Sequence, residues 1–229
     1  MGGIIAVFPG MKRILVVGSS WVGDMVMAQS LFKVLRRESD QCHISVLAPA
    51  WSAPVSARMP EVAETIAMPV GHGRLDLAAR WRLARGIKGR FEQAIILPGS
   101  FKSALVPFFA GIPRRTGWRG EWRYGLLSDL RKLDEQALPL MIQRFAALGL
   151  PAGERLPDKL PVPELVVDPV KAQACRDKFS LDKDRPILAL CPGAEFGGAK
   201  RWPEEYYGEL ARGYLDRGWQ LALFGSVND

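Results

Sequence analysis

The chain has 229 residues, of which 48% are hydrophobic and 24% charged, an ordinary composition for a soluble globular protein. Its two histidines are too few for a histidine-rich metal site. No apolar run approaches the roughly 20 residues that a membrane-spanning helix needs.

The positive charge is concentrated in one part of the sequence. The formal net charge is +7, and residues 74–132 hold 13 Lys/Arg against 4 Asp/Glu, a net of +9, so that the remaining residues sum to −2. This region should favour an anionic partner. From charge alone the partner can be a nucleic acid, a membrane surface or an acidic small molecule.

Short apolar strands alternate with amphipathic helices from the start of the chain. Strands are expected at 13–18, 43–48, 65–68 and 93–98, and helices at about 24–37, 75–87 and 135–149. This alternation predicts an α/β fold, in which right-handed βαβ units build a doubly wound parallel sheet.

A proline-rich stretch divides the chain. Residues 151–169 contain five prolines and no sustained hydrophobic period, which is typical of a linker. We therefore predict one Rossmann-like domain over 1–160 and the start of a second over 161–229. After the linker we expect helices at about 169–179 and 203–218 and strands at 187–191 and 220–225. Two strands do not complete a Rossmann-like sheet, so the second domain is expected to be truncated.

The cysteines and the first residues bear on where the protein works. Cys42, Cys175 and Cys191 are far apart and form no CxxC pair, which indicates reduced thiols in a cytoplasmic protein, with Cys191 packed in the core of its strand. The first ten residues, MGGIIAVFPG, make a poor signal peptide. Because Met11 before KRILVVG resembles a natural start, residues 1–10 are interpreted as a non-native extension.

The first loop of interest is GSSWVGDM (18–25), directly after the first strand. Its glycine spacing resembles a phosphate-binding loop, but Asp24 stands where that loop requires a lysine. Two interpretations of Asp24 stay open here. It can cap its helix, which is the commoner role of such a residue, or act as a base that faces a cleft.

A second loop, PGAEFGGAKRWP (192–203), carries Lys200 and Arg201 before a predicted helix. The pattern matches neither a Walker sequence nor a dinucleotide fingerprint. Two cations at a helix N-terminus oppose the helix dipole unless an anion binds there, which favours a phosphate over a merely solvated pair. In an open α/β sheet, both loops lie where ligands gather, at the carboxyl ends of the strands.

Cations and aromatic side chains alternate in FKSALVPFFAGIPRRTGWRGEWRYGLL (101–127). Such a segment can stack and pair with single-stranded RNA, bind a phosphorylated sugar, or form a solvated edge. Composition does not separate these three alternatives.

Taken together, SSWVGDMVMAQSL, APAW, RMPEV, MPVGHGRL, the 101–127 segment and CPGAEFGGAKRWP resemble the lipopolysaccharide heptosyltransferases. MVMAQ after Gly23-Asp24, where type I enzymes typically carry a histidine, favours type II. The resemblance covers nearly all of 11–229. It implies a GT-B fold, in which two Rossmann-like domains face a cleft, and a metal-independent inverting transfer without a cofactor.

The resemblance also assigns substrates and residues. The donor is ADP-L-glycero-D-manno-heptose, and the acceptor is the first heptose on an anionic Kdo-lipid A, reached by peripheral contact with the cytoplasmic face of the inner membrane. Asp24 is the implied catalytic base. The implied donor-binding residues are Gly193, Glu195, Phe196, Lys200 and Gly225, and the implied acceptor-binding residues are Ser20, Trp21, Lys102, Arg119 and Arg123.

Two rival functions remain at this point. One is heptosyltransferase I or another nucleotide-sugar glycosyltransferase, which an exchange of acceptors would distinguish. The other is an RNA-binding protein, although the resemblance implies no nucleic acid partner. Because the family's later donor-contacting segment lies beyond Asp229, we expect the chain to be inactive by itself.

Overall fold

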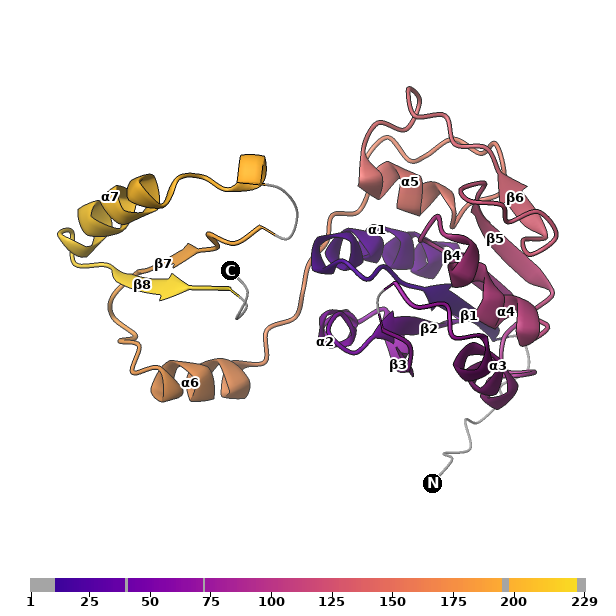
Figure 1. The fold of residues 1–229 in the computed structure, drawn as a ribbon, viewed down its shortest axis with the longest axis horizontal. Helices are drawn as coiled ribbons and strands as arrows, with labels where there is room; N and C mark the ends of the chain where they lie inside the picture. The colour runs from indigo at the N-terminus through magenta and orange to yellow at the C-terminus, as the bar shows by residue number, and fades with distance from the viewer. Residues whose placement is uncertain (1–10, 40, 72, 195–197, 226–229) are drawn as a thin grey trace. The chain divides into compact units, whose positions relative to one another are not determined.

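The computed structural model describes residues 11–39, 41–71, 73–194 and 198–225 (Figure 1). Cys191 is not part of a strand core as expected, because it follows β7 and is exposed, whereas Cys42 is buried. The chain forms two compact units, which divide between Val166 and Val167. Each is described by itself.

The first unit contains a sheet of six parallel strands. Their bounds are β1 Lys12–Val17, β2 Cys42–Pro49, β3 Val62–Met68, β4 Gln93–Ile96, β5 Arg114–Trp118 and β6 Asp129–Arg131. The order across the sheet is β3-β2-β1-β4-β5-β6. The chain thus builds outward from β1 to β3, then returns to place β4 on the other side of β1. The crevice between β1 and β4 is the point at which the strand order reverses.

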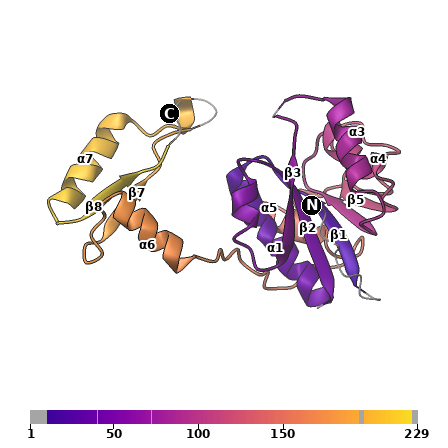
Figure 2. The same ribbon diagram turned by 90° about the horizontal axis from the view of Figure 1, so that it is seen from below.

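Helices cover both faces of this sheet (Figure 2). Alternating β1 residues point to opposite sides: Ile14 and Val16 pack with Phe32 of α1, whereas Leu15 and Val17 belong to the core under α3 and α4. The continuous apolar sequence of β1 follows from this double burial. The helices are α1 Val22–Glu38, α2 Ala53–Ser56, α3 Leu77–Gly86, η1 Phe101–Ala104, α4 Leu105–Phe109 and α5 Met141–Ala147.

The strands β5 and β6 were not predicted, because neither has an apolar pattern. Polar side chains connect them instead. The Thr116 hydroxyl donates to the Asp129 carboxylate at 3.0 Å, and the Arg131 guanidinium donates to the same carboxylate at 2.8 Å. Arg131 is only 8% exposed, so this ion pair is a partly buried structural contact rather than a surface one.

The predicted helix over 135–149 is shorter than expected, since α5 spans only Met141–Ala147. Pro139 explains the difference, because a proline inside a helix removes a backbone donor and collides with the preceding turn. The chain before it forms a separate turn, in which the Leu138 N–H donates to the Asp134 carbonyl at 3.0 Å.

The segment after α5 returns along α1. The Gln29 side chain, which is fully buried, donates to the Glu164 carbonyl at 2.9 Å and accepts from the Glu164 N–H at 2.6 Å. Lys33 donates to the Val162 carbonyl at 2.9 Å, and the Val166 N–H donates to the Arg58 carbonyl at 2.9 Å. These bonds hold the segment against the first unit as far as Val166.

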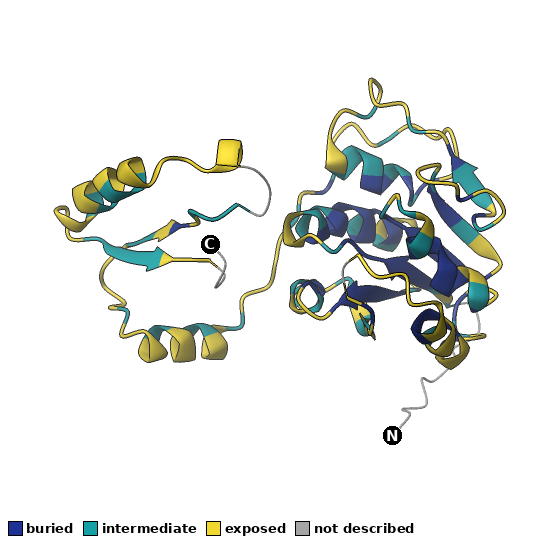
Figure 3. Cartoon of the chain, in the orientation of Figure 1, coloured by how far each residue is buried: buried dark blue, intermediate teal, exposed yellow. Residues whose placement is uncertain are grey.

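The second unit is a two-stranded parallel sheet with two α-helices. Its elements are α6 Pro169–Lys178, β7 Ile187–Leu190, η2 Gly198–Lys200, α7 Glu204–Leu215 and β8 Gln220–Leu223. Among the described residues of this unit, Leu190 alone is buried. Figure 3 shows the contrast with the dark blue interior of the first unit. No helix in the described ranges is long and apolar enough to cross a membrane.

We predict that Asp129→Asn lowers the free energy of unfolding by about 1–3 kcal/mol at neutral pH, the usual effect of removing one partner of a buried bond. The hydrogen bond from Arg131 lowers the pKa of the Asp129 carboxyl in the folded protein. The contribution is therefore complete above about pH 4, where an unfolded aspartate is ionised, and is lost as the pH falls through the lower folded-state value.

Denaturant titrations at pH 7 and at pH 3 measure this difference. The matched control is Asp158→Asn, because the Asp158–Arg155 pair is almost fully exposed and should contribute little. An Asp129→Asn effect of equal size at both pH values would contradict the assignment.

Candidate functional site

A small cavity lies at the β1–β4 crevice of the first unit. Its volume is about 70 Å³, and the ends of β1, β2, β3 and β4 and the loops after them surround it. The lining residues that carry polar or aromatic side chains are Ser20, Trp51, Arg80, Ser100, Lys102 and Ser103. The site thus occupies the position at which open α/β sheets bind ligands.

Asp24 lies in the first turn of α1, four residues after Ser20, which lines this cavity. Its half-buried carboxylate accepts a hydrogen bond from the Ser19 hydroxyl at 3.1 Å, and the Ser19 oxygen accepts from the Trp21 N–H at 3.2 Å. The residue that caps α1 is Trp21, which makes no side-chain cap bond. Asp24 is therefore not the N-cap residue, and the capping interpretation of its carboxylate is wrong.

The loop before Asp24 is fixed by residues that follow β2. The Trp51 indole N–H donates to the Ser20 carbonyl at 2.7 Å, and the Ser52 hydroxyl donates to the Ser19 carbonyl at 3.1 Å. Two loops that are more than 30 residues apart in sequence thereby become one surface. These contacts were not predicted: Trp51 belongs to the APAW segment of the family resemblance, but nothing in the sequence pairs it with the Ser20 backbone.

Trp51, Ser100, Ser103 and Arg80 line the cavity but were not predicted from the sequence, and Arg80 is the charged one among them. It is 4% exposed, and its guanidinium donates to the carbonyls of Leu75, Arg74 and Lys102. Burial lowers the pKa of Arg80, although Asp76 raises it in part. A signal was present in the sequence: Arg80 stands four residues before Ala84, on the apolar side of its helix.

Two predicted acceptor cations differ in environment. Arg119 is exposed, but Arg123 is 0% exposed, and its guanidinium donates to the carbonyls of Pro98, Trp118 and Arg119. Burial lowers the pKa of Arg123 to about 10, opposed by the charge of Glu121. The expectation that Arg123 offers a surface cation to an acceptor is corrected: in this structure it holds loops together.

The loops that Arg123 joins lead directly to Lys102. The Glu121 N–H donates to the Gly99 carbonyl at 2.9 Å, and the Glu121 carboxylate accepts from the Phe101 N–H at 3.0 Å. Gly120, with φ of +48°, approaches the Gly99 carbonyl so closely that a Cβ atom would lie 2.2 Å from its oxygen. This contact fixes the start of η1, and with it the half-buried Lys102.

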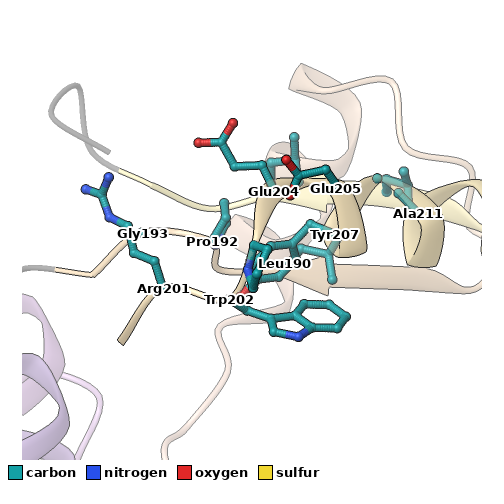
Figure 4. A pocket seen from close by; sticks show the side chains of 13 residues that line it. Leu190, Pro192, Gly193, Arg201, Trp202, Glu204, Glu205, Tyr207 and Ala211 are labelled. Atoms are coloured by element: carbon teal, nitrogen blue, oxygen red, sulfur yellow. The ribbon is translucent and has the colours of Figure 1, made fainter. Parts of the chain in front are cut away.

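The second unit holds a larger hollow at the carboxyl ends of β7 and β8, with a volume of about 610 Å³. Gly193 and Arg201 line it. Figure 4 shows Leu190, Trp202 and Tyr207 close together, with the Arg201 side chain extending away from them. The Trp202 and Tyr207 rings meet edge to face at 4.9 Å.

Two other predicted donor residues, Lys200 and Gly225, are described but are not among the residues that line this hollow. Lys200 ends the short η2 turn and is exposed, and Gly225 is exposed beyond β8. Glu195 and Phe196 lie outside the described residues.

The start of α7 corrects one argument made from the sequence. Pro203 is the N-cap, and Glu204 and Glu205 occupy the first turn. These two carboxylates already complement the helix dipole, so Lys200 and Arg201 do not oppose it unaided. The two cations, and not the helix dipole, therefore favour an anion at this loop.

In the described part of the chain, no three His, Cys, Asp or Glu side chains are grouped so as to hold a metal ion. The sequence matches the profile of glycosyltransferase family 9 (heptosyltransferase) over residues 80–229. The chain belongs to this family. Comparison with named members of the family and with solved structures shows which of them it resembles.

The chain is 52% identical over 223 residues to the lipopolysaccharide heptosyltransferase 2 of Escherichia coli (strain K12), which covers 95% of this chain and 64% of that protein. The lipooligosaccharide heptosyltransferase 2 of Haemophilus influenzae is 46% identical over 225 residues, with the same coverage of 95% and 64%. This family 9 chain thus spans about two thirds of the length of the curated relatives it matches.

The solved structure of E. coli ADP-heptose lipopolysaccharide heptosyltransferase II matches with a TM-score of 0.86 and 49% sequence identity, over 95% of this chain and 65% of that one. This match confirms the predicted GT-B heptosyltransferase fold over the shared residues. The parallel six-stranded sheet and the shorter second sheet are the parts of that fold present here.

The Gly120–Gly99 contact gives a test of the loop geometry. Gly120→Ala should lower the free energy of unfolding by at least about 1 kcal/mol more than Gly125→Ala. Both glycines have positive φ, but only the added Cβ at position 120 meets backbone atoms, while at 125 it meets nothing within 4 Å. Urea unfolding of the two variants measures the difference. Equal losses would show that the loops are not held as described.

Proposed function

We propose that this chain is the greater part of an inverting heptosyltransferase II, which moves heptose from ADP-heptose to the first heptose of the lipopolysaccharide inner core. One observation carries the proposal: Asp24, in the first turn of the helix that follows β1, presents a half-buried carboxylate that is oriented by the Ser19 hydroxyl. The 52% identity to a lipopolysaccharide heptosyltransferase 2 supports the choice of substrates and of type II over type I.

The proposed role of Asp24 is that of general base. As the acceptor hydroxyl attacks the anomeric carbon of the donor heptose, its proton passes to the Asp24 carboxylate. A new glycosidic C–O bond forms while the bond from the anomeric carbon to the diphosphate oxygen breaks. The Ser19 hydroxyl bond holds the carboxylate in one orientation, so that an oxygen is directed at the incoming hydroxyl.

The proposed role of the second unit is to bind the nucleotide. Negative charge grows on the diphosphate as ADP leaves, and fixed cations stabilise such charge. Lys200, the cation of the predicted donor set, follows Gly193 on the loop, and Arg201 lines the hollow beside it. We assign both cations to the diphosphate and add Arg201 to the predicted set, while Glu195, Phe196 and Gly225 stay as proposed neighbours.

The proposed acceptor side is the first unit. Ser20 and Trp21 flank the Asp24 loop, and Lys102 and the exposed Arg119 belong to the basic segment 74–132. The exposed Trp122, at 85%, adds an amphipathic ring of the kind found at membrane interfaces. We place the enzyme in the cytoplasm, in peripheral contact with the inner membrane that carries its acceptor.

The Asp24→Asn variant tests the proposal, in a protein of the relatives' full length that carries this sequence. Transfer should fall about 10²–10⁴-fold, the usual contribution of a general base, while ADP-heptose binding is retained. The matched control is Glu38→Gln, which removes an exposed carboxylate from the last turn of the same helix and should leave transfer normal.

The assay measures the release of ADP from ADP-heptose in the presence of a purified heptose-bearing acceptor. It is repeated with an acceptor that lacks the first heptose. Normal turnover by Asp24→Asn would reject the base assignment. Transfer only to the acceptor without heptose would replace type II by type I.

A further inference from the structure

We infer that the cavity at the β1–β4 crevice is a subsite for one oxyanion, a carboxylate or a phosphate group, bound by Arg80 and Lys102. The inference rests on the proposed function only in identifying the oxyanion as part of the acceptor. The binding site itself follows from the charges, partners and size of the cavity.

The charge of Arg80 has no carboxylate partner in the described ranges. The residue is 4% exposed, and the oxygen atoms that its guanidinium contacts are three neutral backbone carbonyls. Asp76, four residues earlier, makes no ion pair with it within the described residues and instead caps α3 by accepting from the Ala79 N–H at 3.0 Å. The charge of Asp76 compensates that of the buried Arg80 only in part. An anion in the cavity beside Arg80 is therefore favoured.

Arg123 differs from Arg80 in its position relative to the cavity. It too is buried on backbone carbonyls, but it is not among the residues that line the cavity. The carbonyls of the loops that it joins satisfy the hydrogen-bond donors of its guanidinium. Arg80 makes the same kind of bonds and also lines the cavity. Of these two arginines, only Arg80 can therefore contact a ligand in the cavity.

Lys102 supplies the second cation. It is half-buried and lines the same cavity, and the described part of the chain offers its ammonium group neither an ion pair nor a hydrogen bond. Arg80 fixes the backbone of Lys102 by donating to its carbonyl at 3.1 Å. Two cations thus line one opening, and both would attract an anion bound there.

The size of the cavity limits the ligand. A volume of about 70 Å³ holds a few water-sized groups, which suits one carboxylate or phosphate and is too small for a sugar ring. Ser20 and Ser100 add hydroxyl groups to the lining. Ser20 is next to Ser19, the partner of Asp24, so an anionic group seated here would hold the rest of its molecule near the Asp24 loop.

The test uses the 229-residue chain and two probes, inorganic phosphate and the sugar acid Kdo, titrated by NMR with the backbone signals of 98–103 as the readout. We expect one probe to bind, and this outcome decides between phosphate and carboxylate. Lys102→Gln should weaken that binding at least about tenfold, as expected for a charge-assisted hydrogen bond. The control Lys88→Gln, an exposed lysine of the same basic segment, should bind like wild type.

Arg80→Gln should abolish binding if α3 stays folded, and Lys102→Gln decides the matter if it does not, because the Lys102 side chain has no structural partner. Absence of binding by both probes, or equal affinity in wild type and Lys102→Gln, would overturn the subsite. In a full-length protein, Lys102→Gln should raise the acceptor KM with little change in kcat. Failure of transfer altogether would count against the proposed function and leave the NMR result unaffected.

Discussion

The parallel sheet of the first unit, buried on both faces, is the constraint on which the rest of the structure depends. Because helices cover both faces, a ligand reaches polar side chains most readily where the strands end, and the order β3-β2-β1-β4-β5-β6 opens a crevice between β1 and β4. The Asp24 loop leaves β1 at this crevice, and the Lys102 turn follows β4 on its other side. The candidate chemistry of the first unit therefore gathers at this edge of its sheet.

Arginine residues give loops at both ends of the sheet their shape. Arg80, Arg115 and Arg123 all donate to backbone carbonyls of neighbouring loops, and burial lowers the pKa of each. A guanidinium can satisfy several carbonyls at once, which suits loops that lack a hydrogen-bond ladder. The basic excess of residues 74–132 is therefore partly internal, and only its exposed members can attract a distant anion.

The sequence predicted the elements with strong apolar patterns and failed where polar contacts decide the structure. The strands β1, β2 and β4 were found because their side chains are buried, whereas β5 and β6 depend on the Thr116–Asp129–Arg131 contacts. The position of Asp24 after β1 was predicted, but its Ser19 partner and the Trp51 contact were not. Pairing between distant loops leaves no periodic trace in a sequence, which also explains why Arg123 looked like a surface cation.

The division of labour between the units is the central claim, and NMR of the seven tryptophan indole signals tests it most directly. The 229-residue chain is titrated separately with a heptose–Kdo acceptor fragment and with ADP. The acceptor fragment should shift the Trp51 signal beside the crevice and leave Trp202 unchanged, while any shift caused by ADP should fall on Trp202 and spare Trp51. An acceptor fragment that moved Trp202, or ADP that moved Trp51, would contradict the account.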